Sequence, residues 1–118
     1  MPDLENILAD ILAFRDERNW ASFHTPKNLS AAIAIEAGEL QDTMLWKTDE
    51  EVQQMLNSPE SKHEIETQLA DVLIFALLCC HATRVDPVRA ITAKLAGNRK
   101  RYPIERASSS SNKNTDFK

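Results

Sequence analysis

Residues 60–83 read ESKHEIETQLADVLIFALLCCHAT, and this stretch decides the fold. It contains no glycine or proline, and every residue from Val72 to Cys80 is apolar. A helix with one buried face carries a single apolar stripe, whereas a segment that is apolar all round predicts a helix buried on every side. A core of four or five helices is too small to surround such a helix. Partner subunits are therefore expected to cover it, in an obligate oligomer.

The composition of the whole chain supports an all-α fold. The chain has 118 residues, which is one domain's length, and 42% of them are hydrophobic and 27% charged. With only 2 glycines and 5 prolines it lacks the frequent turns of a β-sandwich or barrel, and it has no glycine-rich phosphate loop. We expect a four- to five-helix bundle that assembles through its apolar central helix.

The helix boundaries follow from capping residues. Asp3 is expected to cap the first helix and Asp86 the last, and Thr48 with Glu51 has the spacing of a capping box. Residues 1–105 are expected to form one domain. Residues 106–118 have almost no apolar content, which predicts a disordered tail. Besides the helix over residues 60–83, helices are expected over residues 3–18, 27–46, 49–56 and 87–101.

The charge and the cysteines indicate a cytoplasmic protein without a stable nucleic-acid partner. The net charge is −4, whereas general nucleic-acid binders are usually basic. Cys79 and Cys80 are adjacent on the central helix, so they cannot pair with each other or form a C-x-x-C site. The longest apolar run, residues 72–80, is far below the ~20 residues of a membrane span.

Acidic residues recur at helical spacing on two of the expected helices. Glu36 and Glu39 are three residues apart, and Glu64, Gln68 and Asp71 follow the i, i+4, i+7 pattern of one helix face. Two ordinary surface pairs would explain the spacing, but these acids lie among apolar residues. Asp71 in particular is expected to be buried, where it would need a cation. Carboxylate and amide oxygens without histidine suit Mg²⁺, with Mn²⁺ as a second possibility.

The last helix carries a basic face. Lys94, Asn98 and Arg101 fall at i, i+4, i+7, and Tyr102 follows directly. These side chains can hold a phosphate through a point charge, an amide and a fork of donors. A solvated basic face is equally compatible with the spacing.

Aromatic residues lie near both ends of the helix expected over 27–46. Trp20, Phe23 and His24 precede it, and Trp46 ends it on the side of Glu39. They could stack on a nucleotide base, or they could be core aromatics.

Five strings in this order resemble one protein family. They are NWASFHTPKNL (residues 19–29), EAGEL (36–40), QLADVLIF (68–75), VDPVRAI (85–91) and the pattern K-x₃-N-x₂-RYP (94–103). Together they look like the MazG-like all-α nucleotide pyrophosphohydrolases, and most like the dCTP pyrophosphatase branch. The resemblance runs from about Arg15 to Pro103.

The resemblance implies an enzyme that hydrolyses nucleoside triphosphates between the α and β phosphates, in a nucleotide-pool house-cleaning role with dCTP-like substrates. It implies Mg²⁺ held by an E-x-x-E and an E-x-x-D on facing helices, and a tetramer built as a pair of dimers. Onto this chain it places Glu36, Glu39 and Asp71 as catalytic metal ligands. It assigns substrate binding to Lys94, Asn98, Tyr102, His24 and Asn28.

The chain departs from this pattern at one position, because Gln68 stands where the family has the glutamate of E-x-x-D. Three explanations stay open: Glu64 takes over, the site binds fewer or weaker metals, or the change is engineered. The departure also keeps an alternative function open. In that case the chain is a catalytically weak, partner-binding or regulatory module that binds nucleotide without turnover.

Overall fold

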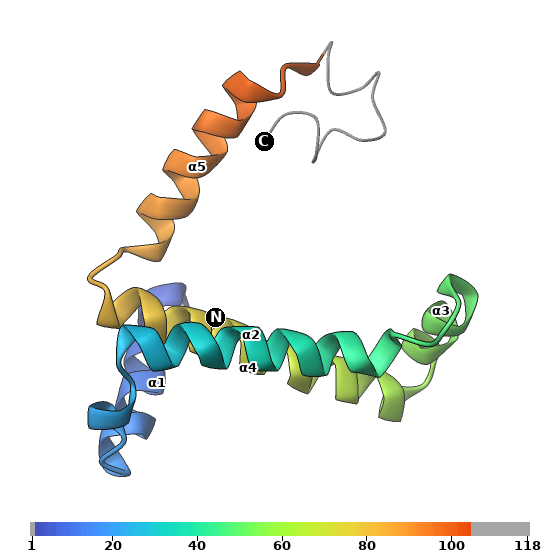
Figure 1. Ribbon diagram of the computed structural model, residues 1–118, viewed down its shortest axis with the longest axis horizontal. Coiled ribbons are helices and arrows are strands. Elements are labelled where there is room, and N and C mark those ends of the chain that lie inside the picture. Colours follow the sequence, from blue (N-terminus) through green and yellow to red (C-terminus); the bar gives the residue numbers. More distant parts are fainter. Residues whose placement is uncertain (1, 105–118) are drawn as a thin grey trace. The chain divides into compact units, whose positions relative to one another are not determined.

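The chain folds into five α-helices, with no strand among residues 2–104, which are the residues that the computed structural model describes. The all-α prediction is confirmed, and every helix begins and ends within two residues of its expected bounds. The predicted disordered tail, residues 106–118, lies outside the described residues. The helices are α1 (Leu4–Glu17), α2 (Pro26–Met44), α3 (Asp49–Asn57), α4 (Pro59–Ala82) and α5 (Pro87–Arg101), with a turn of 3₁₀ helix, η1 (Ala21–Phe23), before α2 (Figure 1).

The expected caps are present. Asp3 accepts a hydrogen bond from the backbone N–H of Asn6 at 2.8 Å, and Asp86 accepts one from that of Arg89 at 3.1 Å. The capping box of α3 is reciprocal: the N–H of Glu51 donates to Thr48 Oγ1, and the N–H of Thr48 donates to Glu51 Oε1. Each cap satisfies helix N–H groups that have no partner inside the helix.

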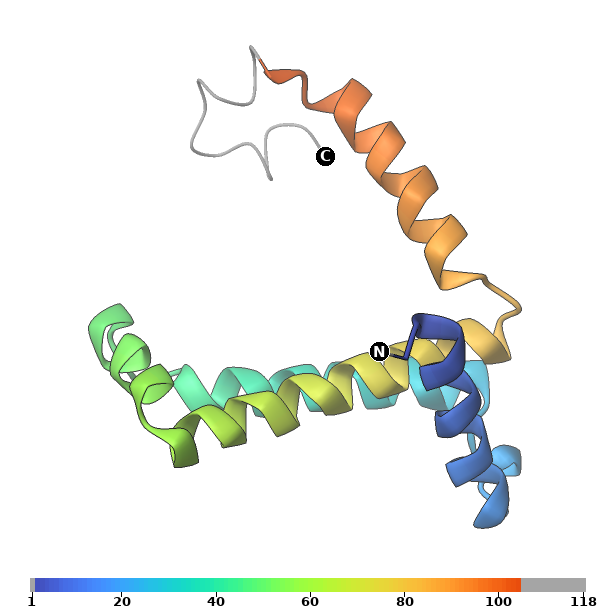
Figure 2. The same ribbon diagram turned by 180° about the vertical axis from the view of Figure 1, so that it is seen from behind.

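The chain divides into two compact units, residues 1–84 with α1 to α4 and residues 85–118 with α5. In the first unit α2 and α4 lie side by side and run in opposite directions (Figures 1 and 2). Helix α1 packs near the end of α4, and α3 packs near its beginning. This pairing brings the middle of α2 beside the middle of α4, where the acidic residues of both helices lie.

The hydrophobic core of the described residues is small. Only Leu29, Ile65 and Leu78 are buried there, whereas Leu73 on α4 is 61% exposed and Ile74 is 37% exposed. The apolar half of α4 is therefore not covered on every side within one chain. Its burial by a partner subunit stays a prediction.

Helix α4 is also the one described helix whose length and hydropathy would suffice to cross a membrane, with a mean hydropathy of 1.5 over 18 residues. The nine-residue apolar run in the sequence did not reveal this. The core helix of a soluble protein has the same composition. Asp71 near the middle of α4 favours the core-helix interpretation, because a carboxylate is costly inside a bilayer.

Candidate active site

A carboxylate cluster forms where α2 meets α4. Glu36 and Glu39 lie one turn apart on α2, and Asp71 on α4 is close enough to act on Glu36 electrostatically. Loss of solvation raises the pKa of Glu36, and the neighbouring carboxylates of Glu39 and Asp71 raise it further. Two of the acids that the sequence spacing proposed as ligands thus act on a third, Glu36, in the fold.

Two oxygen atoms of this region lack any partner. Glu36 Oε2 and Gln68 Oε1 are shielded from solvent, and neither accepts a hydrogen bond. An enclosed acceptor without a donor costs roughly 1–3 kcal/mol, and a cation can satisfy several such oxygens at once. Because these atoms and their carboxylate neighbours are all hard oxygen donors, the residues fit Mg²⁺ or Mn²⁺. Among residues 2–104, however, no three His, Cys, Asp or Glu side chains converge closely enough to hold a metal by themselves.

The proposed ligand Asp71 is more exposed than the sequence predicted. Asp71 was expected to be buried, yet its side chain is exposed in the single chain. The apolar neighbours that suggested burial, such as Leu73, are themselves uncovered. Glu64 is also exposed, and it does not contribute to the raised pKa of Glu36. Its backbone carbonyl accepts a hydrogen bond from Thr67 Oγ1 at 2.9 Å.

An aromatic cluster lies at the start of α2. The rings of Phe14 and Trp20 are 5.8 Å apart, those of Trp20 and His24 are 6.4 Å apart, and those of His24 and Phe75 are 6.3 Å apart. His24 Nδ1 is enclosed and has no hydrogen-bond partner. Phe75 joins α4 to this cluster, and the sequence analysis missed it because it is one apolar residue in an uninterrupted apolar run.

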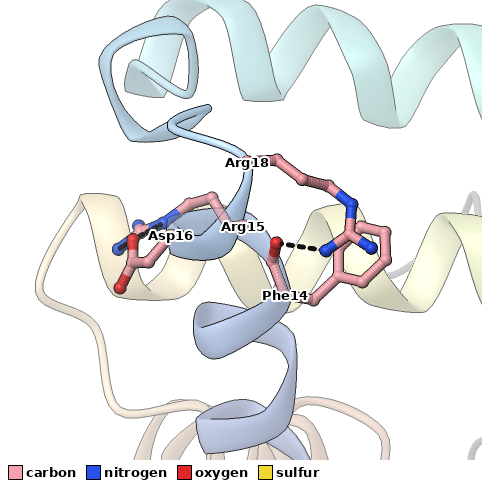
Figure 3. Close-up of polar contacts among 4 residues, drawn as sticks. All are labelled: Phe14, Arg15, Asp16 and Arg18. Atoms are coloured by element: carbon pink, nitrogen blue, oxygen red, sulfur yellow. Dashed lines mark hydrogen bonds and ion pairs between the residues drawn. The ribbon is translucent and has the colours of Figure 1, made fainter.

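The turn that carries these aromatics is fixed at both ends. Arg18 at the end of α1 stacks its guanidinium 3.7 Å from the centre of the Phe14 ring and donates to the Phe14 carbonyl, while Arg15 pairs with Asp16 (Figure 3). On the other side, Asn28 Nδ2 donates to the carbonyl of Phe23 at 3.0 Å. In this structure the amide of Asn28, which was expected to bind substrate, holds η1 against the start of α2.

Trp46 lies far from the aromatic cluster in the same chain. It follows α2 and is 92% exposed, whereas Trp20 precedes α2 and is 43% exposed. The 19 residues of α2 separate its two ends by about 27 Å at 1.5 Å per residue. One chain therefore does not bring both tryptophans to a single base.

The expected phosphate-binding residues belong to the second unit. Lys94, Asn98 and Arg101 lie on α5, at the spacing that places them on one face of that helix. Tyr102 is the C-cap residue of α5, and its N–H donates to the carbonyl of Asn98 at 2.8 Å. Lys94 and Arg101 are exposed, whereas Asn98 and Tyr102 are half-buried.

Comparisons with known proteins agree with this fold. The MazG-like family matches residues 31–117. Human dCTP pyrophosphatase 1 is 40% identical, and the match spans 98% of this chain and 68% of the human protein. The Bos taurus dCTP pyrophosphatase 1 is 37% identical over 98% of this chain and 69% of its own length. The crystal structure of a pyrophosphatase from Archaeoglobus fulgidus superposes with a TM-score of 0.79 at 36% identity, covering 87% of this chain and 94% of the other. The chain therefore belongs to the MazG-like family, and it is an enzyme of the nucleotide pyrophosphatase class.

Proposed function

We propose that this enzyme hydrolyses nucleoside triphosphates between the α and β phosphates in the presence of Mg²⁺ or Mn²⁺, with dCTP-like substrates favoured. The observation that carries the proposal is the cluster of Glu36, Glu39 and Asp71, together with the unpartnered oxygens of Glu36 and Gln68. The names of the relatives, which are dCTP pyrophosphatases, support the choice of substrate. A house-cleaning role in the cytoplasm belongs to the same proposal.

The carboxylates of the cluster have two proposed roles, which are metal binding and activation of the attacking water. Glu36, Glu39 and Asp71 would hold the metal, with Gln68 as a neutral oxygen donor, and a bound Mg²⁺ supplies charge neutralisation and a more acidic water. Glu39 belongs to the same cluster and is an exposed side chain. We assign to its carboxylate the orientation of the attacking water and the acceptance of its proton. Glu64 is a weaker choice for a ligand because it does not contribute to the raised pKa of Glu36.

The substrate's base and phosphates have separate candidate residues. Trp20 and His24 form part of an aromatic cluster suited to stacking a base. Lys94, Asn98, Arg101 and Tyr102 are proposed to bind the phosphates, on the strength of the family pattern and their shared helix. Lys94 would neutralise charge on the departing pyrophosphate.

The enzyme is proposed to act as a homo-oligomer, most simply the tetramer that the family resemblance implies. The small core and the exposed Leu73 of α4 leave apolar surface that a second copy can cover. The separation of Trp20 from Trp46 adds a geometric reason. If both tryptophans contact one base, they must come from two different chains.

A panel of nucleoside triphosphates, assayed for pyrophosphate release with and without Mg²⁺, tests the activity. We expect release that requires the metal and is lost in Glu39→Gln, whereas Asp10→Asn, which removes one exposed charge from α1, should retain it. Nucleotide binding without release in the wild-type enzyme would instead support the regulatory module.

Mixing two inactive variants tests the composite site. Oligomers that contain Trp20→Ala chains and Trp46→Ala chains should regain activity, because one of the two kinds of shared site then carries both tryptophans. A site built within one chain would give no recovery, since every chain lacks one of the two residues.

A further inference from the structure

We infer that this chain does not hold a divalent cation in the absence of substrate. Because Gln68 is neutral, the cation binds together with the phosphates of the nucleotide. The inference rests on the proposed function and concerns the same carboxylate cluster. It concerns this chain's own residue, because Gln68 stands where the family resemblance implies a glutamate.

The position of Gln68 supports a role toward the cation. Gln68 lies three residues before Asp71 on α4 and three residues after the buried Ile65. Its Oε1 is shielded from solvent and has no donor partner, as is Glu36 Oε2 on α2. Buried polar atoms are normally hydrogen-bonded, so an enclosed amide oxygen without a protein donor is free to face a cation. The unpartnered oxygens of Gln68 on α4 and Glu36 on α2 therefore indicate which side of α4 would face a cation.

The charge of Gln68 determines how tightly that cation is held without substrate. The cluster supplies three carboxylates, Glu36, Glu39 and Asp71, of which Asp71 and Glu39 are exposed to solvent. The affinity of hard cations rises with the number of charged ligands and with the rigidity of the site. Mg²⁺ in particular is commonly bound through one or two carboxylates plus substrate phosphates. With a neutral fourth oxygen, the phosphates of the substrate supply the missing negative charge.

Direct metal binding tests this without turnover. Mn²⁺ binding is titrated by electron paramagnetic resonance for the wild-type enzyme, Gln68→Glu and Thr67→Glu, each without nucleotide. Thr67 is exposed on the neighbouring position of α4, so Thr67→Glu adds the same charge outside the enclosed side. We expect Gln68→Glu to bind Mn²⁺ about tenfold more tightly or better, and Thr67→Glu to resemble the wild type. Equal affinities in Gln68→Glu and the wild type would overturn the inference.

A second titration adds the α,β-methylene analogue of the best substrate, which cannot be cleaved at the scissile bridge. The wild-type enzyme should gain at least about tenfold in Mn²⁺ affinity, because the analogue's phosphates complete the ligand charge. Gln68→Glu should gain less, since its site already has the fourth charge. Tight Mn²⁺ binding by the wild type in the absence of the analogue would refute the inference. It would leave the proposed pyrophosphatase activity intact, whereas absence of pyrophosphate release from every triphosphate would refute that activity.

Thermal unfolding distinguishes a change in metal binding from misfolding of the variant. In EDTA, Gln68→Glu should melt below the wild type, because it adds a fourth carboxylate to the cluster. In excess Mn²⁺ it should show the larger rise in melting temperature, because the ligand stabilises the state that binds it. A role in packing alone predicts the first effect without the second, and that result counts against the inference. Gln68→Met, which removes the oxygen and adds no charge, should reduce the Mn²⁺ affinity measured with the analogue, and unchanged affinity would count against it too.

Discussion

Replacing Leu73 by lysine should break the assembly of the enzyme while leaving the packing inside each chain nearly intact. Leu73 lies in the apolar half of α4 and is 61% exposed in the single chain. In an isolated chain, a lysine there would point a charge into water at little cost. In an interface, it would place an unpaired charge among apolar side chains, which is strongly unfavourable.

The size of the effect follows from the exposed fraction. Complete burial of a leucine side chain contributes about 1.5–3 kcal/mol. Since 61% of Leu73 is still exposed, covering it in an assembly contributes about 1–2 kcal/mol per chain. The desolvated lysine charge adds a penalty on top of this loss. A twofold-related interface contains the residue twice, so the loss is doubled for each dimer.

Light scattering after gel filtration measures the outcome. The wild-type enzyme should have a mass that is a multiple of 13.3 kDa, and Leu73→Lys should shift toward one chain mass. Gln53→Lys, an exposed position on α3, controls for the added charge and should assemble normally. A Leu73→Lys variant that retains the wild-type mass and melting temperature would show that this face of α4 is not an interface.

Three further outcomes follow from single side chains. Leu29→Ala should lower the free energy of unfolding by about 2–5 kcal/mol, as measured by urea denaturation, because Leu29 is only 1% exposed. Thr48→Ala should cost about 1 kcal/mol in the same assay, because it removes the acceptor of the Glu51 N–H. The contribution of this cap to stability depends on pH through the carboxylate of Glu51. The hydrogen bond from the Thr48 N–H lowers the pKa of Glu51 below its ordinary 4.5, so its contribution to stability is present above that pH and is lost as the pH falls through the lowered value. Wild-type stability should therefore decrease more steeply below pH 4.5 than that of Glu51→Gln, and parallel curves would contradict this assignment.

The helices were predictable from the sequence because their determinants are local. Asp3, Thr48 and Asp86 sit beside the N–H groups that they cap, so a short window of sequence contains the whole interaction. The pairing of acids on α2 was visible for the same reason, since residues three apart share a side of a helix.

Other features of the site depend on contacts between distant segments. The contact of Phe75 with His24 joins residues 51 positions apart, and nothing in an apolar run distinguishes one phenylalanine from its neighbours. The hydrogen bond from Asn28 to the Phe23 carbonyl depends on the turn of η1, which lies between the helices that the sequence predicted. The exposure of Asp71 was also missed, because apolar neighbours indicate burial somewhere but do not say in which chain.

Three exposed side chains have one physical explanation in a second copy of the chain. Asp71, Leu73 and Trp46 are uncovered; Leu73 and Trp46 are large apolar side chains that an interface would bury, and Asp71 lies two residues before Leu73 on α4. An apolar partner surface over α4 would bury Leu73 and reduce the solvent around Asp71, which strengthens the attraction of its carboxylate for a cation. A second copy could also bring its own Trp46 to the aromatic cluster at the start of α2, which one chain's Trp46 does not reach across the length of that helix. Assembly and catalysis are then coupled, so Leu73→Lys should reduce pyrophosphate release and Mn²⁺ affinity together, although Leu73 is neither a proposed ligand nor a proposed substrate contact. A monomeric Leu73→Lys enzyme with wild-type turnover would separate the two and show that each chain carries a complete site.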